Sequence, residues 1–457
     1  MRRLRIILAI SVCKLARVGL RILGRGGTNL PGKLALRILP DILGVLGSQV
    51  STVVITGTNG KTTSARMLEQ CFQNGGLSAF SNRSGANLLP GITAEFVANA
   101  GLRGKMRLSH AIIECDEAAF KLAAPYLDAK IVLVTNVFRD QLDRYGEITH
   151  TLNSIRLGIE RSPRATVCLN ADCALCVGMA ADLPNPIRYF GVAGALYGDA
   201  SEVAADLARC VDCGGDYAYD YRTFGHLGGW RCTACGFGRP DVGVSVTRVL
   251  EETPDTTAVE VEVGGVLHAV TINLPGAYNI YNAAGVIAVA EVLGIDMEVT
   301  GAALAEFRGG FGRMERLTVG DTDVRMILVK NPIGCSQVLR YLAATTEPMQ
   351  LVICLNDKPA DGTDVSWLWD VDTVPLGQMG DKLTAVHCGG IRADDLAVWV
   401  KYAGVEPGKI RVEYDNGKLL EAVAQSDVPV YIMPTYTALL ELRERLVKQY
   451  GLRKFWE

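Results

Sequence analysis

The sequence predicts an α/β protein with a phosphate-binding first domain, an inserted four-cysteine segment and a second α/β domain. Three observations support this prediction. A short β-branched run at 53–55 leads into a glycine turn and then into a helical pattern at 64–71. Further short apolar runs alternate with helical patterns, both before and after residue 314. Between them, two C-x2-C pairs interrupt the alternation.

Length and composition limit the class of protein. A chain of 457 residues is too long for one ordinary core, so we expect roughly two to four domains. The apolar fraction of 49% and the charged fraction of 21% are typical of a soluble globular protein. A formal net charge of −3 argues against a general nucleic-acid binder and leaves only local charged patches.

One such patch lies at the start of the chain, where residues 1–40 hold nine Arg or Lys and no Asp or Glu. In residues 1–23 the apolar run is short, cationic residues resume at Lys14, and no small-x-small cleavage site follows. These features favour a retained amphipathic helix over a signal peptide. Such a helix either lies on an anionic membrane surface or packs its apolar side on the protein. No apolar run elsewhere is long enough to predict a membrane span.

The glycine turn has the features of a phosphate-binding loop. Gly57 and Gly60 let backbone N–H groups face an anion, the following helix contributes its positive dipole end, and Lys61 adds a mobile charge. Thr62 is then placed to reach a magnesium ion. In the strict G-x-x-x-x-G-K-[ST] pattern the first glycine would fall at Ile55, so the match is incomplete. The predicted nucleotide-binding residues of the loop are Gly57, Thr58, Asn59, Gly60, Lys61, Thr62 and Thr63.

Polar residues follow the next predicted strands. Glu114 comes directly after the apolar run 111–113, and a second run at 131–136 leads into a charged stretch at 137–146. In an open parallel sheet, ligands lie at the carboxyl ends of the strands, so we expect Glu114 to share the magnesium with Thr62. A polar glycine loop at 81–91 carries Arg83 and Asn87, which could meet phosphate or substrate or simply lie on the surface.

Four of the thirteen cysteines form a regular pattern. Cys210 and Cys213 are separated from Cys232 and Cys235 by eighteen residues, with glycines at the predicted knuckle turns. This spacing predicts a four-cysteine zinc ribbon, with four inert core thiols as the alternative. A site closed by four thiolates leaves no open coordination position, so its role would be structural or in docking.

The rest of the chain returns to α/β patterns. Two alternating runs, 258–263 and 269–274, flank Gly264 and Gly265, and a helical pattern then starts with Asn279 and Asn282 on one face. Further strands are expected at 324–329, 350–355, 384–387 and 430–433. We therefore expect a basic helical segment at 1–48, a nucleotide-binding domain at 49–313 with the ribbon at about 205–240, and an α/β domain at 314–457.

Several motifs resemble those of the Mur ligases and folylpolyglutamate synthases. They are T-G-T-N-G-K-T-T at 56–63, T-N-x-x-x-D-Q-L-D at 135–143, G-A-Y-N-x-x-N-A-A at 276–284 and G-R-M-E at 312–315. Gln141 and Tyr278 replace histidines of the family pattern. The resemblance implies a Mur-ligase-like central domain, a Rossmann-like C-terminal domain, and ATP with Mg²⁺ as cofactors. It also implies adenine contacts from Asn279 and Asn282 and a phosphate contact from Arg313.

A second set of motifs resembles the MurT family within the Mur ligases. This set includes V-K-N-P at 329–332, with Lys330 as a departure from other Mur ligases, and N-D-x-x-A-D-G-x-D-x-S-W at 356–367. The resemblance implies ATP-dependent amidation of the D-glutamate α-carboxylate of lipid II to D-isoglutamine, through an acyl phosphate, in peptidoglycan biosynthesis. A Mur-type ligase that adds an amino acid, and a non-enzymatic docking module, are the alternatives.

Ammonia for such an amidation needs a source, and the sequence has no G-x-C-x-G nucleophile turn of a glutaminase. The resemblance implies a heterodimer with a glutaminase subunit, GatD, whose Cys-His pair an Asp of this chain would complete. We rank Asp357 first because it follows the strand 350–355, and then Asp364 and Asp361. With Lys61 and Glu114 these are the catalytic candidates. The expected location is the cytoplasm, at the inner face of the membrane if the basic helix binds there; the choice of lipid II or a soluble precursor stays open.

Overall fold

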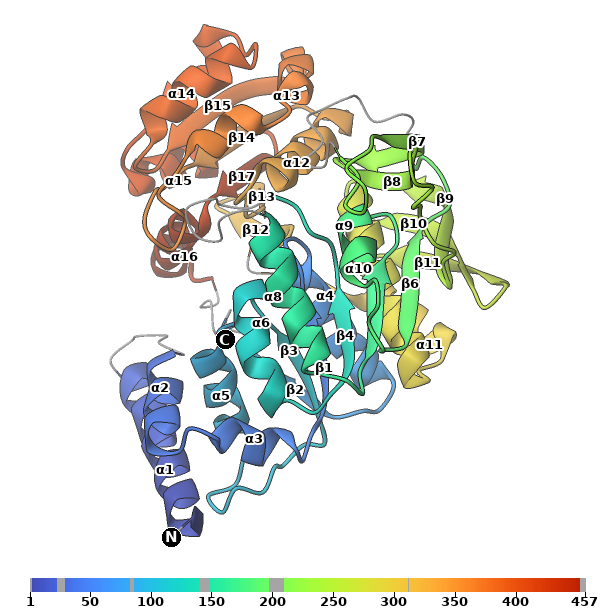
Figure 1. Ribbon diagram of the computed structural model, residues 1–457. Coiled ribbons are helices and arrows are strands. Elements are labelled where there is room, and N and C mark those ends of the chain that lie inside the picture. Colours follow the sequence, from blue (N-terminus) through green and yellow to red (C-terminus); the bar gives the residue numbers. More distant parts are fainter. Residues whose placement is uncertain are drawn as a thin grey trace. The chain divides into compact units, whose positions relative to one another are not determined.

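The computed structural model describes residues 2–22, 29–82, 86–139, 148–196, 209–310 and 312–452. These residues form two compact units, shown in Figure 1. The first unit holds most of the chain up to Phe307, and the second holds residues 274–276 and the chain from Arg308 onward. The predicted domain ranges stay predictions. Among the described helices, none combines the length and apolar content needed to cross a bilayer.

A nine-stranded sheet forms the centre of the first unit, in the order β11-β10-β9-β6-β5-β4-β1-β3-β2. The strands from β2 to β6 run parallel to their neighbours, β9 joins β6 in parallel, and β10 and β11 add an antiparallel edge. The strands are β1 (Ser51–Thr56), β2 (Ala79–Ser81), β3 (His110–Glu114), β4 (Ala129–Val134), β5 (Thr166–Asn170), β6 (Ile187–Val192), β9 (Val244–Glu252), β10 (Thr257–Val263) and β11 (Val266–Ile272). The predicted parallel α/β sheet is confirmed.

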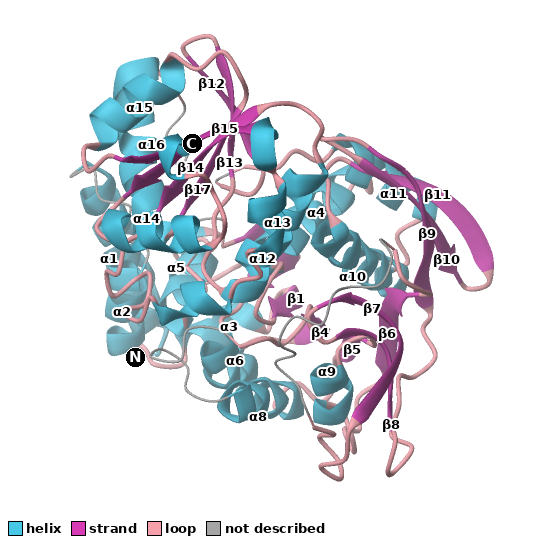
Figure 2. Cartoon of the chain, turned by 90° about the horizontal axis from the view of Figure 1, so that it is seen from above, coloured by secondary structure: helices cyan, strands magenta, loops and turns pink. Residues whose placement is uncertain are grey.

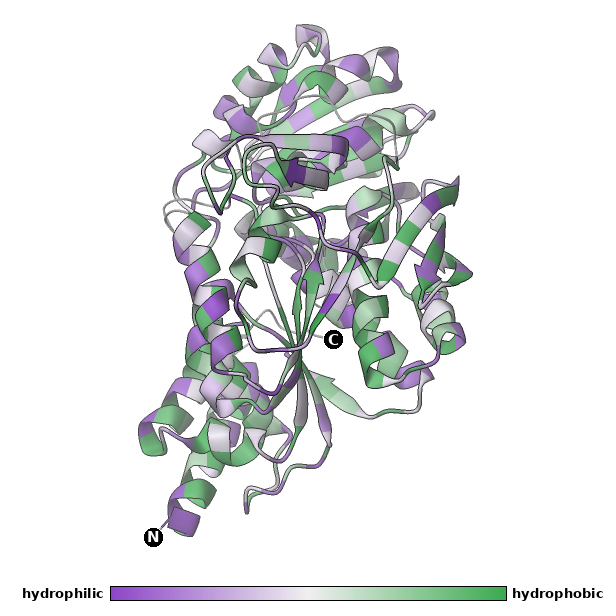
Figure 3. Cartoon of the chain, turned by 45° about the vertical axis from the view of Figure 1, so that its right-hand side comes forward, coloured by the Kyte–Doolittle hydropathy of each residue, from purple (hydrophilic) through white to green (hydrophobic). Residues whose placement is uncertain are grey.

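Helices cover both faces of this sheet, which explains why its central strands are apolar along most of their length. Figure 2 shows α4 and α10 on one side and α6, α8 and α9 on the other, and Figure 3 shows the hydrophobic strands between them. The helices are α4 (Lys61–Asn74), α6 (Glu117–Ala123), α8 (Ile148–Glu160), α9 (Ala174–Met179), α10 (Ala277–Leu293) and α11 (Met297–Glu306). Because α10 packs on the sheet and on α4 and α11, it is buried over most of its length.

The N-terminal segment forms helices that pack on the first unit. They are α1 (Arg2–Ile22), α2 (Asn29–Ile38) and α3 (Ile42–Gly47), with α5 (Leu89–Ala98) against α1, α2 and α3. Within the segment 1–48, predicted to be helical, the chain breaks at residues 39–41, where Pro40 removes a backbone donor and disfavours a helical residue before it. The predicted helix at the start of the chain is confirmed, and it packs on the protein through Ala9, Ile10 and Cys13.

The inserted segment forms a two-stranded hairpin of β7 (Tyr217–Phe224) and β8 (Leu227–Cys232). Trp230 of β8 is buried against Tyr217 and Phe237, and its indole N–H donates to the Ala171 carbonyl, 3.0 Å away. Arg239, near the end of the insertion, pairs with the fully buried Asp172 at 2.7 Å. Burial raises the pKa of Asp172, and the Arg239 charge opposes that rise. The insertion is therefore fixed to the loop that follows β5.

The second unit is built on a six-stranded sheet in the order β12-β13-β17-β14-β15-β16, parallel except for the β12–β13 hairpin. Along β14, Leu351 and Ile353 face one core and Val352 and Cys354 face the other, as a strand buried on both sides requires. The strands are β12 (Glu315–Val319), β13 (Thr322–Met326), β14 (Met349–Cys354), β15 (Leu383–Gly389), β16 (Ile410–Val412) and β17 (Val430–Pro434). The helices are α12 (Pro332–Ala344), α13 (Val374–Gln378), α14 (Ala393–Tyr402), α15 (Asn416–Ala424) and α16 (Tyr436–Tyr450).

Candidate active site

The predicted phosphate-binding loop joins β1 to α4, and both of its glycines have positive φ angles, +120° at Gly57 and +88° at Gly60. Neither position has room for a side chain. A Cβ on Gly57 would lie 2.4 Å from the Thr135 hydroxyl, and a Cβ on Gly60 would lie 2.0 Å from Asn282 Oδ1. The helix begins at Lys61, three residues earlier than the predicted 64, so the loop ends on a helix N-terminus, where an anion is favoured.

Lys61 lies buried within this loop. Its ammonium is 2.7 Å from Glu117 Oε1 and also donates to the carbonyls of Gly57 and Thr58. Burial lowers the pKa of Lys61, but the carboxylates of Glu117, Glu114 and Asp116 more than offset that effect and raise the pKa above its usual value. Lys61 therefore stays cationic at neutral pH, as a phosphate-binding lysine must.

Thr62 and Glu114, the predicted magnesium pair, are adjacent. The Thr62 hydroxyl donates to Glu114 Oε2 at 2.8 Å, close to the edge of about 2.9 Å expected between neighbouring oxygens around octahedral Mg²⁺. The Asn82 side chain holds the backbone of Glu114 through two hydrogen bonds. Its Oδ1 accepts from the Glu114 N–H at 2.9 Å, and its amide donates to the Glu114 carbonyl at 2.7 Å. The oxygen donors fit a magnesium ion, and the magnesium assignment itself stays a prediction.

The end of β4 holds the loop backbone. Asn136 Oδ1 accepts from the Asn59 N–H at 3.0 Å, and its amide donates back to the Asn59 carbonyl at 3.2 Å. The Thr135 hydroxyl donates to the same carbonyl at 2.7 Å. The Thr58 N–H donates to the Asn136 carbonyl at 2.9 Å. The loop is thus fixed by a neighbouring strand end and not only by its own turn.

The two asparagines predicted to contact adenine lie in the first turn of α10. The Asn282 amide donates to Asn279 Oδ1 at 3.2 Å, and Asn282 Oδ1 faces Gly60. Both side chains are buried, at 1% exposure for Asn279 and 4% for Asn282, so each is held in one orientation beside the loop. The structure therefore brings α10 and the phosphate-binding loop together.

Some residues at this site were not predicted. Glu117, Asn82, Thr135 and Asn136 all contact the loop or Glu114. Their common signal is a position after the strands β2, β3 and β4, where polar residues interrupt apolar runs. Arg83 and Gln141, which had been singled out, lie outside the described residues. Asn87, also singled out, contributes a backbone carbonyl that accepts from the Asp116 N–H at 3.0 Å.

The remaining predicted residues belong to the second unit. Arg313 is half-buried between Gly312 and Met314, both of which have positive φ angles. Asn331 caps α12 by accepting from the Gly334 N–H at 2.8 Å, and Lys330 precedes it. These two residues lie between β13 and α12 in the chain.

The acidic loop follows β14 and holds its three aspartates in different ways. Asp357 forms an ion pair with Arg392 at 2.7 Å and keeps 22% of its side chain exposed. Asp361 is buried and accepts from the backbone and hydroxyl of Thr437. Asp364 is exposed and accepts from the Ser366 N–H at 2.8 Å. Asp357 and Asp364 are thus accessible from solvent, whereas Asp361 fastens the loop to α16.

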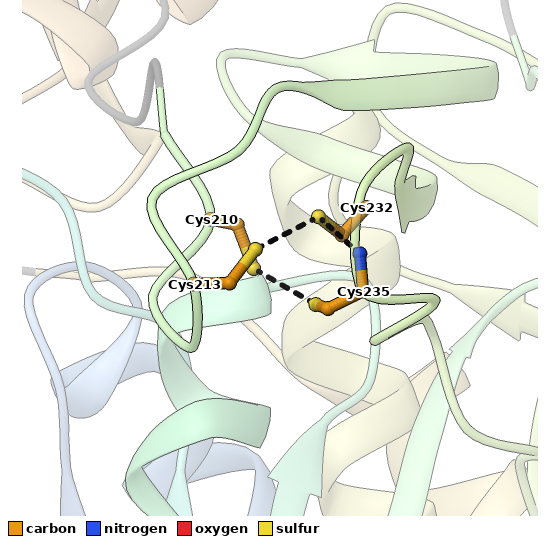
Figure 4. A group of neighbouring side chains, drawn as sticks. All are labelled: Cys210, Cys213, Cys232 and Cys235. Carbon is orange, nitrogen blue, oxygen red and sulfur yellow. Dashed lines mark hydrogen bonds between the residues drawn. The ribbon is translucent and has the colours of Figure 1, made fainter.

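The four predicted cysteines converge, and Figure 4 shows their sulfurs turned toward one another from two loops. All four Sγ atoms lie within 4.8 Å of one another, with 3.8 Å between Cys210 and Cys235 and 3.5 Å between Cys213 and Cys232. These values are close to the edge of about 3.8 Å of a tetrahedron with Zn–S bonds of about 2.3 Å. Hydrogen bonds from the backbone N–H groups of Cys235 and Ala234 lower the pKa of the Cys232 thiol to about 6, whereas the pKa of Cys213 and of Cys235 is raised among the neighbouring thiols, so the geometry of the sulfurs, and not their pKa values, indicates a metal. The donor set fits a zinc ion.

Comparison with solved structures defines the class of protein. The chain is similar to a pseudomurein peptide ligase type C from Methanothermus fervidus, with a TM-score of 0.62 and 19% identity over 88% of this chain and 79% of the other. It is also similar to MurF from Acinetobacter baumannii, with a TM-score of 0.63 and 14% identity over 91% of this chain and 80% of the other. The model of the Mur ligase middle domain matches residues 55–207. The fold is that of the Mur ligases, which are ATP-dependent.

Comparison of sequences identifies the branch. The model of the MurT ligase C-terminal domain matches residues 328–439. The MurT subunit of lipid II isoglutaminyl synthase from Streptococcus pneumoniae is 35% identical over 94% of this chain and 95% of its own length. The corresponding subunit from Staphylococcus aureus is 29% identical over 97% of this chain and 98% of its own length. The chain therefore belongs to the MurT family, and it is an ATP-dependent ligase.

Replacement of Gly60 by alanine tests the loop geometry. The added Cβ would clash with Asn282 and require a strained positive φ, so we expect Gly60→Ala to weaken ATP binding by at least about tenfold. Fluorescent-nucleotide titration measures this. Gly301→Ala, in α11, is the matched control because nothing lies within 4 Å of its Cβ position. Equal ATP affinity in both variants would show that the loop does not bind the nucleotide as described.

Proposed function

We propose that this chain amidates the D-glutamate α-carboxylate of the lipid II stem peptide to D-isoglutamine, using ATP, magnesium and ammonia from a partner subunit. The observation that carries the proposal is the convergence of Lys61 and the Thr62–Glu114 pair at the strand ends of a Mur ligase fold. Relatives in Streptococcus pneumoniae and Staphylococcus aureus carry the name lipid II isoglutaminyl synthase (glutamine-hydrolyzing) subunit MurT.

The first chemical step activates the carboxylate. A carboxylate oxygen attacks the γ-phosphorus of ATP, the bond to the β-phosphate oxygen breaks, and ADP leaves, so the product is an acyl phosphate. The Lys61 ammonium neutralises charge on the phosphates, and Asn279 and Asn282 orient the adenine. Magnesium on Thr62 and Glu114 would balance the charge that develops on the transferred phosphoryl group. By its resemblance to the Mur ligase motif, Arg313 would supply a further cation for the phosphates.

The second step forms the amide. Ammonia attacks the carbonyl carbon of the acyl phosphate, the carbon–oxygen bond to phosphate breaks, and the nitrogen loses a proton to give the neutral amide. An acyl phosphate needs no further activation, because inorganic phosphate is a good leaving group. The oxygen of a free carboxylate is a poor leaving group. Lys330 stands where other Mur ligases carry a histidine before Asn-Pro, which favours ammonia over an amino acid as the nucleophile in this proposal.

The ammonia would come from a glutaminase subunit, GatD, in a heterodimer. The second unit offers an exposed aromatic pair for such a partner, Trp369 at 60% exposure and Tyr402 at 78%, with ring centroids 6.0 Å apart. Large exposed aromatic side chains are typical anchors of protein interfaces. Asp357 stays the first candidate for completing the partner's Cys-His pair, because Arg392 holds its carboxylate in place and part of it remains exposed. Asp364 and Asp361 follow.

We further propose that the Cys210, Cys213, Cys232 and Cys235 cluster holds a structural zinc ion in a zinc ribbon. Four sulfurs close the coordination sphere, so the ion would not act in catalysis. Backbone N–H groups of Asp212, Gly215 and Ala234 each lie 3.4 Å from a cysteine sulfur two residues earlier, which is the arrangement that stabilises metal-bound thiolates. The C-terminal unit would complete a Rossmann-like ligase domain, and the protein would act in the cytoplasm at the inner face of the membrane.

Metal analysis tests the zinc proposal. We expect about one zinc per chain in the purified protein, and loss of that zinc in Cys213→Ser/Cys235→Ser, because two ligands cannot hold the ion tightly. The control is Cys71→Ala, a buried cysteine of α4 outside the cluster, which should keep the zinc. Equal zinc content in the two variants, or a folded wild-type protein without zinc, would contradict the proposal.

An amidation assay on lipid II tests the reaction. The chain and its glutaminase partner should convert lipid II with ATP and glutamine, or with ATP and free ammonia. Lys61→Ala should lower both rates by at least about a hundredfold, because both need the acyl phosphate. The three aspartates Asp357, Asp364 and Asp361 are each replaced by Asn in turn. Replacement of the aspartate that serves the partner should lower only the glutamine-dependent rate, by about a hundredfold or more.

For the Asn variants the two nitrogen sources serve as controls for each other, since a misfolded variant would lose both; for Lys61→Ala, an unchanged circular dichroism spectrum and melting temperature are the control for folding. Full activity of Lys61→Ala would contradict the nucleotide site. Normal glutamine use by all three Asn variants would contradict the shared aspartate. Incorporation of an amino acid in place of ammonia would favour the alternative, a Mur-type ligase that extends the peptide.

A further inference from the structure

Helix α1 has an apolar stripe that the described part of the chain does not cover. Ala9, Ile10 and Cys13 are buried where the helix packs against α2 and α5. The stripe lies on another side of the helix and consists of Leu4, Leu8, Leu15, Val18 and Ile22, with exposures of 73%, 53%, 71%, 54% and 80%. At 100° per residue these five positions fall within about a quarter of the helix circumference. Packing on the protein therefore accounts for only one of the helix's two apolar sides.

Cations accompany the stripe. Arg3, Lys14 and Arg21 lie along one edge of it by the same helical spacing, and residues 1–40 contain no acidic residue. Two other cations of the helix are offset by carboxylates from elsewhere, since Arg2 pairs with Asp41 at 2.7 Å and Arg17 with Glu95 at 3.1 Å. The helix thus keeps an excess of positive charge next to exposed leucines.

A second basic segment, the loop 101–107, lies against another side of α1. It reads G-L-R-G-K-M-R, with Leu102 at 56% exposure and no acidic residue. The loop and the residue before it lie close to α1. The Lys14 ammonium donates to the carbonyl of Ala100, and a Cβ on Gly104 would lie 2.9 Å from Ile6 Cγ2. The loop therefore adds cations near α1 but does not cover the exposed stripe.

We propose that the exposed stripe of α1, with the cations along its edge, docks on an anionic lipid bilayer, with α1 lying in the plane of the interface. Exposed leucines suit the acyl boundary, and neighbouring Arg and Lys suit the phosphates of anionic headgroups. Over 21 residues the helix is about 30 Å long, so it would contact many lipids at once. A self-associating helix would need acidic partners for its cations, and neither segment supplies them. The inference rests on the membrane location proposed above and adds the surface responsible.

Vesicle flotation with the full chain tests this surface. We expect binding to vesicles of equal parts phosphatidylglycerol and phosphatidylcholine, little binding to phosphatidylcholine alone, and weaker binding as salt rises. Leu8→Ser/Leu15→Ser should lower the partition coefficient by at least about tenfold, because both side chains would enter the interface. Arg3→Gln/Arg21→Gln should lower binding to anionic vesicles only.

The matched control is Val266→Ser/Leu267→Ser, on the edge strand β11 of the same unit, where the two side chains are 56% and 57% exposed. It should bind vesicles like the wild type. Failure of the wild type to bind anionic vesicles, or equal binding by the stripe variant and the control, would overturn the proposal. So would a stripe variant that binds vesicles normally but changes the oligomeric state in light scattering, since the stripe would then be a contact between copies. The assay needs neither ATP nor glutamine, so its failure is distinct from failure of the ligase reaction.

Discussion

The hydrogen bonds that join Asn59 to the end of β4 are the constraint on which the proposed nucleotide site depends. A loop with two glycines is free to take many conformations, and ordering it costs free energy unless neighbouring groups fix its backbone. Asn136 satisfies both the N–H and the carbonyl of Asn59, and Thr135 adds a third bond to that carbonyl. With the loop held in this way, Lys61 stays beside Glu117 and Thr62 stays beside Glu114.

The same constraint connects the site to the four-cysteine insertion. The Asn170 amide donates to the Thr135 carbonyl at 3.1 Å, and the Asp172 N–H donates to Asn170 Oδ1 at 3.0 Å. Asp172 in turn accepts from Arg239, near the end of the insertion, and from Tyr281 of α10. The proposed zinc would therefore affect the proposed nucleotide loop without taking part in catalysis, because it would order the segment whose Arg239 bonds Asp172. Its contribution to activity would be through rigidity of this chain of hydrogen bonds.

Much of this could be predicted from local sequence, because local patterns determine it. Gly57, Gly60 and Lys61 follow a strand pattern and precede a helix pattern, and the cysteine pairs have a fixed spacing. The roles of Glu117 and Asn136 could not be predicted, since they depend on the register of parallel strands. Thr56 of β1 lies opposite Val134 of β4, which brings Asn136 level with the loop. Similarly, apolar periodicity identified α1 as amphipathic but could not separate the buried Ala9 and Ile10 from the exposed Leu8 and Leu15.

The central claim is that a carboxylate of the substrate becomes an acyl phosphate at this site. Isotope transfer tests it most directly, with lipid II carrying ¹⁸O in the D-glutamate α-carboxylate and with ATP and ammonia as the other reactants. The account predicts that each amide formed releases inorganic phosphate with one ¹⁸O atom, because the carboxylate oxygen that attacks the γ-phosphorus leaves with the phosphate. Amide formation with unlabelled phosphate, or with the label in AMP, would contradict the account.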